Sequence, residues 1–436
     1  MLVALSSPAR VPESAGPATA VPLFALLVVA LTLRPQLSAV GPLAPGIIDE
    51  LGASHAFVGL LTTIPVLCMG IFAPFGPGLV RFVGARAGVA ISVGILVLFA
   101  LLRPFASDAA MLLVFTFGIG IGTAVVGPIL PMFVRGRMPQ RMVAGTAAYA
   151  AGIIVGAAIA STVAVPLEQA LGGWRGSLLA LSLGSIPAIW LWIVLVRGAP
   201  SRAPGGSVAQ AGAAPAPKPS ISPHLPLRRP IAWVIGLLFG LQSWLYYGVM
   251  AWLASVYIER GWEPATAALL LTLVSLASLS GIVGVPYASR RGASRRSLLV
   301  SAAGSSAAGL LGVALVPGPA VLWAILLGIG LGVTFTLVLT LPTDISDDPR
   351  ETGGAAALMF LVGYILASLA PFALGAVRDA TGDFAASLWL LVVIAVAMMP
   401  LSWVLAPHRL RPAGRGGPGA RAHREAVPAE PGPASR

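Results

Sequence analysis

Charged residues are scarce in this sequence. Asp, Glu, Lys and Arg make up only 10% of its 436 residues, whereas 57% are apolar and the mean hydropathy is +0.92. Soluble domains carry about 25% charged residues. The shortage of charge therefore excludes a soluble globular protein and predicts an integral membrane protein.

Cysteine and histidine are also rare. The single cysteine, Cys68, excludes an intramolecular disulfide, and its place in an apolar run favours a packing role. The four histidines fall outside the long apolar runs, no Asp, Glu or His lies deep within one, and no phosphate-binding loop is present. We therefore expect neither an enzyme nor a metal or cofactor site.

Acidic residues are outnumbered by basic ones, 15 to 27, which gives a net charge of +12. Such an excess is also found in nucleic-acid-binding proteins. Here, however, the basic residues fall in short loops between apolar runs, which is typical of membrane topology. The sequence therefore predicts a lipid bilayer as partner, and no nucleic acid.

Long apolar runs, by contrast, are abundant. A membrane-spanning helix needs about 20 predominantly apolar residues. By that rule the sequence predicts an all-α integral membrane protein with twelve transmembrane helices in two groups of six. The expected spans are 21–44, 56–80, 87–106, 109–134, 142–166, 176–197, 231–257, 264–289, 296–316, 319–342, 353–377 and 384–406.

The rest of the chain divides around these spans. Segment 1–20 starts with MLVALSS, too short for a signal peptide, so the first span at the start of the 21–197 bundle is expected to be retained. A Pro/Ala/Gly-rich linker, 198–229, separates this bundle from the second, 230–406, and the Arg/Pro/Gly-rich tail 407–436 is expected to be disordered.

The distribution of basic residues predicts the orientation. With a cytoplasmic N-terminus, 22 of the 27 basic residues fall on the inner side, four on the outer side and one, Arg34, within a span. The four expected in outer loops are Arg103, Arg175, Arg260 and Arg378. This bias predicts a plasma (inner) membrane protein with both termini in the cytoplasm.

The two groups of spans resemble each other. LLTTIPVLCMG at 60–70 aligns with LLTLVSLASLS at 270–280, and GIGIGT at 118–123 aligns with GIGLGV at 328–333. Both pairs are 210 positions apart, and the basic loops at 81–86 and 290–296 fall close to the same register. A parallel repeat of six spans is therefore predicted.

Arg34 is the exception to the shortage of charge. It lies about 14 residues into the first apolar run, and Pro35, Gly41-Pro42 and Pro45 are expected to interrupt the helix around it. A cation at that depth is costly and normally faces a polar cavity or a partner. The interrupted helix therefore indicates a binding site for something small and negative.

These features resemble the major facilitator superfamily across residues 20–406. The superfamily's loop between spans 2 and 3 has the form G-x-x-x-D-R-x-G-R-R. GPGLVRFVGAR here retains Gly84 and Arg86 but has Arg81 where the acid is expected. The second-half counterpart, YASRRGASRR with Arg290 and Arg291, also lacks the acid. The resemblance implies a gating role for these loops, while fixing topology or binding lipid headgroups remains the alternative.

A finer resemblance involves two segments. LTLRPQLSAVGPLAP in span 1 and GLQSWLYYGVMAWLASVYIERG in span 7 are similar to the cyanate transporter and nitroimidazole transporter family. Ala254 stands where that family commonly has a proline. The resemblance implies transport of cyanate-like or nitroimidazole-like solutes by alternating access of the two bundles.

In this architecture the site lies at mid-membrane between the bundles. A guanidinium donates two parallel hydrogen bonds to a planar anion, so Arg34 is the first candidate. Gln242 and Tyr246 share a helix face at the repeat-equivalent depth. For this pair an interhelical packing bond is the alternative, and Tyr247 and Trp252 are expected to be core aromatics. The candidate substrate-binding residues are Arg34, Gln242, Tyr246, Tyr364 and Tyr149.

The sequence thus predicts a monomeric secondary or facilitated transporter of a small anionic or planar polar solute. A multidrug efflux carrier of the same fold is the first alternative, but it predicts an acid embedded in the membrane. A membrane sensor that does not transport is the second, and it predicts an added soluble domain. Substrate identity, direction of transport and the coupling ion stay open.

Overall fold

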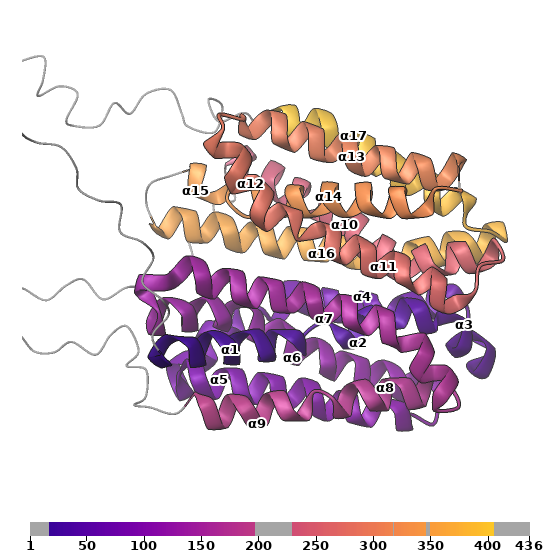
Figure 1. Ribbon diagram of the computed structural model, residues 1–436, viewed down its shortest axis with the longest axis horizontal. Coiled ribbons are helices and arrows are strands. Elements are labelled where there is room, and N and C mark those ends of the chain that lie inside the picture. The colour runs from indigo at the N-terminus through magenta and orange to yellow at the C-terminus, as the bar shows by residue number, and fades with distance from the viewer. Residues whose placement is uncertain (1–16, 197–228, 317, 346–348, 405–436) are drawn as a thin grey trace, which may run out of the picture.

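The computed structural model describes residues 17–196, 229–316, 318–345 and 349–404, and within these ranges the chain is helical with short turns. Two halves lie side by side, the N-terminal half in indigo to magenta and the C-terminal half in pink to yellow (Figure 1). The N-terminal half contains α1 (Pro17–Leu31), α2 (Pro35–Ser38), α3 (Val40–Leu51), α4 (His55–Phe72), α5 (Phe75–Leu102), η1 (Arg103–Phe105), α6 (Ala109–Arg137), η2 (Pro139–Arg141), α7 (Met142–Ala170), α8 (Trp174–Leu183) and α9 (Ile186–Leu195). The C-terminal half contains α10 (Pro230–Glu259), α11 (Pro264–Ser278), α12 (Ser280–Arg290), α13 (Arg295–Leu315), α14 (Ala320–Val338), α15 (Pro342–Ile345), α16 (Pro349–Thr381) and α17 (Ala385–Val404).

Twelve stretches of the described residues are long and apolar enough to cross a membrane, which confirms the predicted number of spans. The first stretch, Val21–Leu51, runs seven residues further than expected. Pro42 and Pro45 do not interrupt it, because α3 continues through both. Pro42 lies in the first turn of α3, where a backbone N–H has no helical partner to lose. The expected segments 1–20, 198–229 and 407–436 lie almost entirely outside the described residues.

The second and third expected spans, 56–80 and 87–106, meet at a turn around Gly84, inside the region labelled α5. Gly84 has φ +79° and ψ 161°, a conformation that glycine adopts without steric cost. Gly76, before this turn, and Gly88, after it, both pack against Ile129 of α6. A straight helix would separate Gly76 from Gly88 by about 18 Å. The chain therefore reverses here, where the sequence predicted a loop.

Equivalent glycines support the internal repeat. In the first half, Gly120 packs on span 2 at Pro65 and Cys68. Gly122 packs on span 3 at Ser92 and Leu96. Gly328 packs on span 8 and Gly330 on span 9 in the second half. Each pair is 208 positions apart, as are Gly84 and Gly292, which both have positive φ. The glycines with matching contacts are thus offset by 208 positions, two fewer than the 210 positions of the sequence repeat.

The two ends of the molecule differ in charge. The end at which α1 and α10 begin and α9 finishes, here called the basic end, carries Arg86, Arg229 and Arg290. The opposite end, here called the His55 end, carries ion pairs between Arg175 and Glu50 and between Arg378 and Glu259, with N–O distances of 2.7 and 2.9 Å.

The halves meet mainly along α4 with α16 and α7 with α11, and α3 also contacts α10. In the first pair, the Thr63 hydroxyl donates to the Ser368 carbonyl at 2.6 Å, and Gly59 lies directly against the Pro371 carbonyl. In the second pair, the Thr162 and Thr272 hydroxyls are 2.8 Å apart. Small side chains therefore let the helices of opposite halves approach to backbone contact.

Helix packing within the C-terminal half gives a first testable prediction. A methyl group at Gly281 of α12 would overlap the Gly332 carbonyl of α14, whereas one at Gly284 would meet nothing within 4 Å. Overpacking costs about 1–3 kcal/mol, so Gly281→Ala is expected to lower the apparent Tm in detergent by about 5 °C. The control Gly284→Ala is expected to leave Tm unchanged or raise it, because alanine is the better helix former. Equal Tm values for the two variants would contradict this close packing.

Candidate functional site around Arg34

A break between α1 and α2 carries Arg34. Helix α1 ends at Leu31, and the Thr32 N–H and hydroxyl both donate to the Val29 carbonyl, at 3.0 and 2.8 Å, which closes a tight turn. Helix α2 begins at Pro35, which has no N–H to continue the bonding of α1. Arg34 is thus held between two helical segments, as the broken-helix prediction required.

The Arg34 guanidinium contacts tyrosines of the other half. Its Nη1 donates to the Tyr247 hydroxyl at 2.6 Å. Its Cζ lies 5.9 Å from the ring centre of Tyr246 and 5.4 Å from that of Tyr247, within the range of cation–π attraction. Tyr364 of α16 is also close enough to interact electrostatically. These contacts, the Arg34 cluster, join span 1 to spans 7 and 11.

The tyrosines are themselves held by aromatic contacts and by sulfur. Tyr246 and Tyr247 meet edge to face at 5.3 Å, and Tyr364 stacks on Phe360 at 5.8 Å. The Tyr247 hydroxyl, which accepts from Arg34, donates to the Met69 sulfur of α4 at 3.7 Å. Tyr247 is 3% exposed and packs into the core of the N-terminal half. Tyr247 is therefore a direct mechanical link between the halves.

Part of the Arg34 cluster remains accessible. Arg34, Tyr246 and Tyr364 are partly exposed although they lie deep within their spans, whereas Tyr247 is buried. The groups that contact the cation are phenols, and no carboxylate pairs with it among the described residues. The cluster thus combines a positive charge with hydrogen-bonding and aromatic groups.

Two other candidates lie away from the guanidinium. The Gln242 amide donates to the Leu331 carbonyl of α14 at 3.3 Å and accepts from Ser243, so its bonds remain within the C-terminal half. Tyr149 lies seven residues before Gly156, which packs against Leu31. Tyr149 is therefore about 10 Å toward the basic end. A substrate role for Gln242 and Tyr149 stays a prediction, and the structure places neither beside Arg34.

The residues of the signature loops lie at the basic end. Arg81, Arg290 and Arg291 are exposed, and the Arg291 guanidinium lies over the Tyr287 ring at 4.6 Å. Arg86 instead donates to the Ile193 carbonyl at 2.7 Å. Arg86 therefore joins spans 3 and 6 within one half, and a gating role for these arginines stays a prediction.

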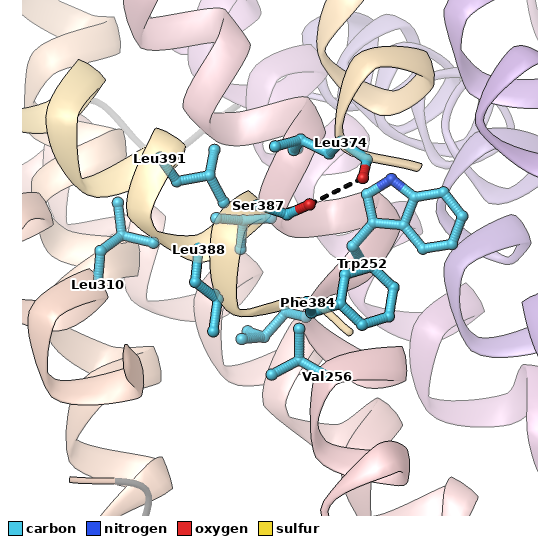
Figure 2. A pocket seen from close by; sticks show the side chains of 11 residues that line it. Trp252, Val256, Leu310, Leu374, Phe384, Ser387, Leu388 and Leu391 are labelled. Atoms are coloured by element: carbon cyan, nitrogen blue, oxygen red, sulfur yellow. Dashed lines mark hydrogen bonds between the residues drawn. The ribbon is translucent and has the colours of Figure 1, made fainter. Parts of the chain in front are cut away.

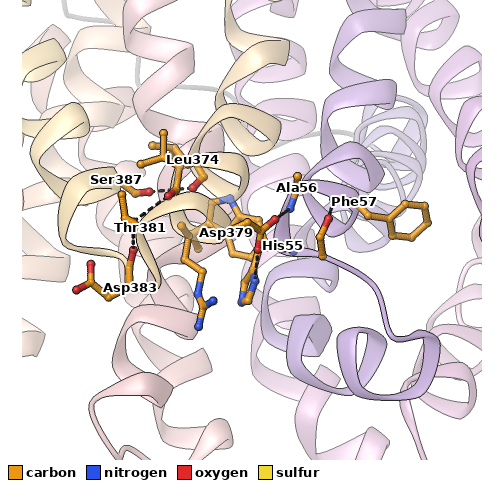
Figure 3. Close-up of polar contacts among 12 residues, drawn as sticks. His55, Ala56, Phe57, Leu374, Asp379, Thr381, Asp383 and Ser387 are labelled. Atoms are coloured by element: carbon orange, nitrogen blue, oxygen red, sulfur yellow. Dashed lines mark hydrogen bonds and ion pairs between the residues drawn. The ribbon is translucent and has the colours of Figure 1, made fainter.

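A polar contact between the halves closes the His55 end (Figure 3). The Asp379 carboxylate of α16 accepts from the backbone N–H groups of His55 and Ala56, at 3.1 and 2.8 Å, and contacts the His55 ring nitrogen at 2.8 Å. Asp379 thus caps the start of α4 from the opposite half. The His55 ring also lies 5.7 Å from Trp252. His55 is one of the four histidines that the sequence placed outside the long apolar runs, and nothing local in the sequence indicates a partner 324 positions away.

A cavity in the C-terminal half lies apart from the Arg34 cluster. It is bounded by apolar side chains such as Trp252, Leu310 and Phe384, and the Ser387 hydroxyl donates to the Leu374 carbonyl beside it (Figure 2). Its free volume of about 10 Å³ has room for one water at most. The cavity is therefore a packing feature and carries no binding site.

Comparisons with known proteins agree with this architecture. The sequence pattern of the Major Facilitator Superfamily matches residues 26–371. The cyanate transport protein CynX of Escherichia coli strain K12 is 30% identical over 388 residues, which cover 89% of this chain and 97% of that protein. The 2-nitroimidazole transporter of the same strain is 26% identical over 373 residues, covering 86% and 92%.

A solved structure shares the fold. The crystal structure of a bacterial homolog of the human lysosomal transporter Spinster, inward-facing and unoccupied, matches with a TM-score of 0.70. It is 16% identical, and the match covers 91% of this chain and 98% of that one. Twelve apolar spans, a family pattern across both halves and relatives that match over nearly their full length lead to one conclusion: the chain is a multi-pass membrane transporter that belongs to the Major Facilitator Superfamily.

Proposed function

We propose that this transporter carries a small, planar, singly charged anion, and that Arg34 binds it. The observation that carries the proposal is the environment of the Arg34 guanidinium, whose hydrogen-bond and cation–π partners are the phenols of Tyr246 and Tyr247. A cation within a membrane is costly unless it is neutralised. An anionic substrate supplies that missing charge.

The side chains of the cluster favour a planar substrate. A guanidinium presents parallel N–H donors that match two acceptor atoms in one plane. The rings of Tyr246 and Tyr364 lie near the same guanidinium, and aromatic rings suit a flat, polarisable solute. The name of one relative, a cyanate transport protein, agrees with a small anion, and that of another, a 2-nitroimidazole transporter, agrees with a flat solute.

The contacts between the halves suggest how binding is coupled to movement. In this structure Arg34 of one half donates to Tyr247 of the other, and Asp379 closes the His55 end. A bound anion competes with the Tyr247 hydroxyl for the guanidinium. Binding therefore exchanges a contact between the halves for a contact with substrate. The substrate then has different affinities for the two alternating states, and this difference shifts the equilibrium between them.

We also propose how the transporter is oriented in the membrane and that it works as a single chain. The basic end faces the cytoplasm of the plasma (inner) membrane, in accord with the positive-inside rule. A single chain is the working unit, because Arg34, Tyr246, Tyr247 and Tyr364 all come from one polypeptide.

Counterflow in proteoliposomes tests the substrate class. Vesicles loaded with unlabelled cyanate receive labelled cyanate, nitrate or 2-nitroimidazole outside, with protein-free vesicles as background. Saturable uptake of at least one planar anion, inhibited by the others and not by neutral urea, is the expected result. Saturable uptake of neutral or cationic solutes alone would refute an anion transporter.

A further inference from the structure

A second arginine is buried in the same half. Arg103, in η1 at the end of α5, is 1% exposed. The sequence placed it in an outer loop, and it does lie in the connection between α5 and α6, but its side chain is buried against Gln36 of α2. Position at the end of an apolar run does not determine the direction of a side chain.

The partners of Arg103 are neutral. Its Nη2 donates to both the carbonyl and the side-chain oxygen of Gln36, at 3.1 and 2.9 Å. The Gln36 amide in turn donates to the Ser182 hydroxyl at 3.0 Å, and Ser182 donates to the Ala100 carbonyl at 2.9 Å. Among the described residues, Nε and Nη1 of Arg103 have no hydrogen-bond acceptor.

Burial of the Arg103 guanidinium among neutral partners opposes folding. A buried charge without a countercharge is destabilising, and apolar side chains of similar size often replace buried charges without loss of stability. Packing therefore does not account for an arginine at this position. The energetic cost points to a function that needs the charge itself.

The location of Gln36 connects Arg103 to the Arg34 cluster. Gln36 lies two residues after Arg34, in the four-residue helix α2, and all four residues of α2 are buried. Arg103 thus holds the segment on which Arg34 is mounted. It also places a second positive charge behind the first, where the low dielectric of the interior strengthens its field.

We propose that Arg103, through Gln36, is a positioning residue for anion binding. It fixes the segment that follows the helix break and adds positive potential at Arg34. This rests on the proposed function, since the potential matters only for a negative substrate. At an effective dielectric constant of about 20, a charge on the order of 10 Å away changes the binding constant of an anion about tenfold.

Gln36→Glu tests the role of the charge. Glutamate retains the acceptor oxygens for Arg103 and neutralises it in place, with nearly the same shape. We expect KM for the transported anion to rise about tenfold, with Vmax and the apparent Tm retained. The matched control Ser182→Ala removes the bond between the Gln36 amide and Ser182. Because no charge changes, its KM is expected to stay within about twofold of the wild type. Equal KM for Gln36→Glu and the wild type, or an equal rise in both variants, would overturn the electrostatic role.

A second readout does not depend on the substrate. In a Cys68→Ser background, Arg34→Cys introduces a thiol whose reaction with neutral iodoacetamide at pH 7 reports the thiolate fraction and hence the local potential. Adding Gln36→Glu is expected to slow this reaction about tenfold, and adding Ser182→Ala is expected to leave it unchanged. An unchanged rate with Gln36→Glu overturns the role of Arg103. If the wild-type protein transports no anion, a slowed rate in the thiol variant still supports the role of Arg103 and refutes the proposed function alone.

Discussion

Arg34→Ala is expected to lower kcat/KM for anion uptake by about 10²- to 10⁴-fold. The guanidinium offers two charge-assisted hydrogen bonds, each contributing about 1.5–3 kcal/mol, and each 1.4 kcal/mol changes a binding constant about tenfold. The loss exceeds that of an ordinary polar contact, because no other cation contacts the Tyr246 and Tyr247 phenols among the described residues. Uptake of labelled anion by proteoliposomes measures the effect.

Two controls separate charge from geometry. Arg34→Lys retains the charge but loses the pair of parallel N–H donors of the guanidinium. An intermediate loss in kcat/KM of about tenfold is expected. Arg135→Ala removes a positive charge from an exposed site at the basic end, where α6 finishes, and little change is expected. If Arg34→Ala transports the anion as the wild type does, Arg34 does not bind the substrate.

Gly59→Ala is expected to favour opening of the His55 end. A methyl group there would overlap the Pro371 carbonyl of the opposite half, and Phe372 lies beside it. Overpacking costs about 1–3 kcal/mol, so the closed arrangement loses about tenfold in population relative to the open one. The effect is specific to the state in which α4 and α16 touch, because an opened interface has room for the methyl group.

A reporter thiol measures this opening. Thr63→Cys in a Cys68→Ser background places a thiol at a residue that is 7% exposed and lies against Ser368 in the closed arrangement. Gly59→Ala is expected to speed its reaction with an impermeant maleimide about tenfold. The matched control Gly127→Ala alters an exposed helical glycine of α6 with nothing within 4 Å, and no change is expected. Equal labelling in both variants would mean that this contact does not hold the end closed.

The Asp379 contact is expected to act in the same direction. Asp379→Ala removes the acceptor for two backbone N–H groups and the His55 ring, so the start of α4 loses its cap from the opposite half. Faster labelling at the Thr63→Cys thiol is the expected result. Slower labelling would show that Asp379 opposes closure.

Much of the architecture is predictable because it depends on local sequence. Twelve apolar runs are long enough to span a bilayer whatever they pack against, and an arginine followed by proline inside one of them marks a helix break. The loop around Gly84 follows equally from its basic and glycine residues. Pro42 and Pro45 were misleading, since a proline interrupts a helix only where its neighbours do not compensate.

Partners across the bundle are not predictable in the same way. Depth in the membrane follows from position along a span, but each residue turns a helix by about 100°, so a small rotation exchanges one facing side chain for another. Gln242 and Tyr247 lie only five residues apart, yet one bonds within its own half and the other to Arg34. Only helix packing decides between them.

The sequence alone thus determines a twelve-span membrane protein with an internal repeat and one arginine inside a broken helix, because hydropathy and helix breaking act over neighbouring residues. The tertiary structure decides that Tyr247 meets Arg34, that Arg103 lies buried behind it, and that Asp379 caps α4. The physical reason is that these contacts join segments far apart in the chain, and their free energies depend on how whole helices rotate and pack.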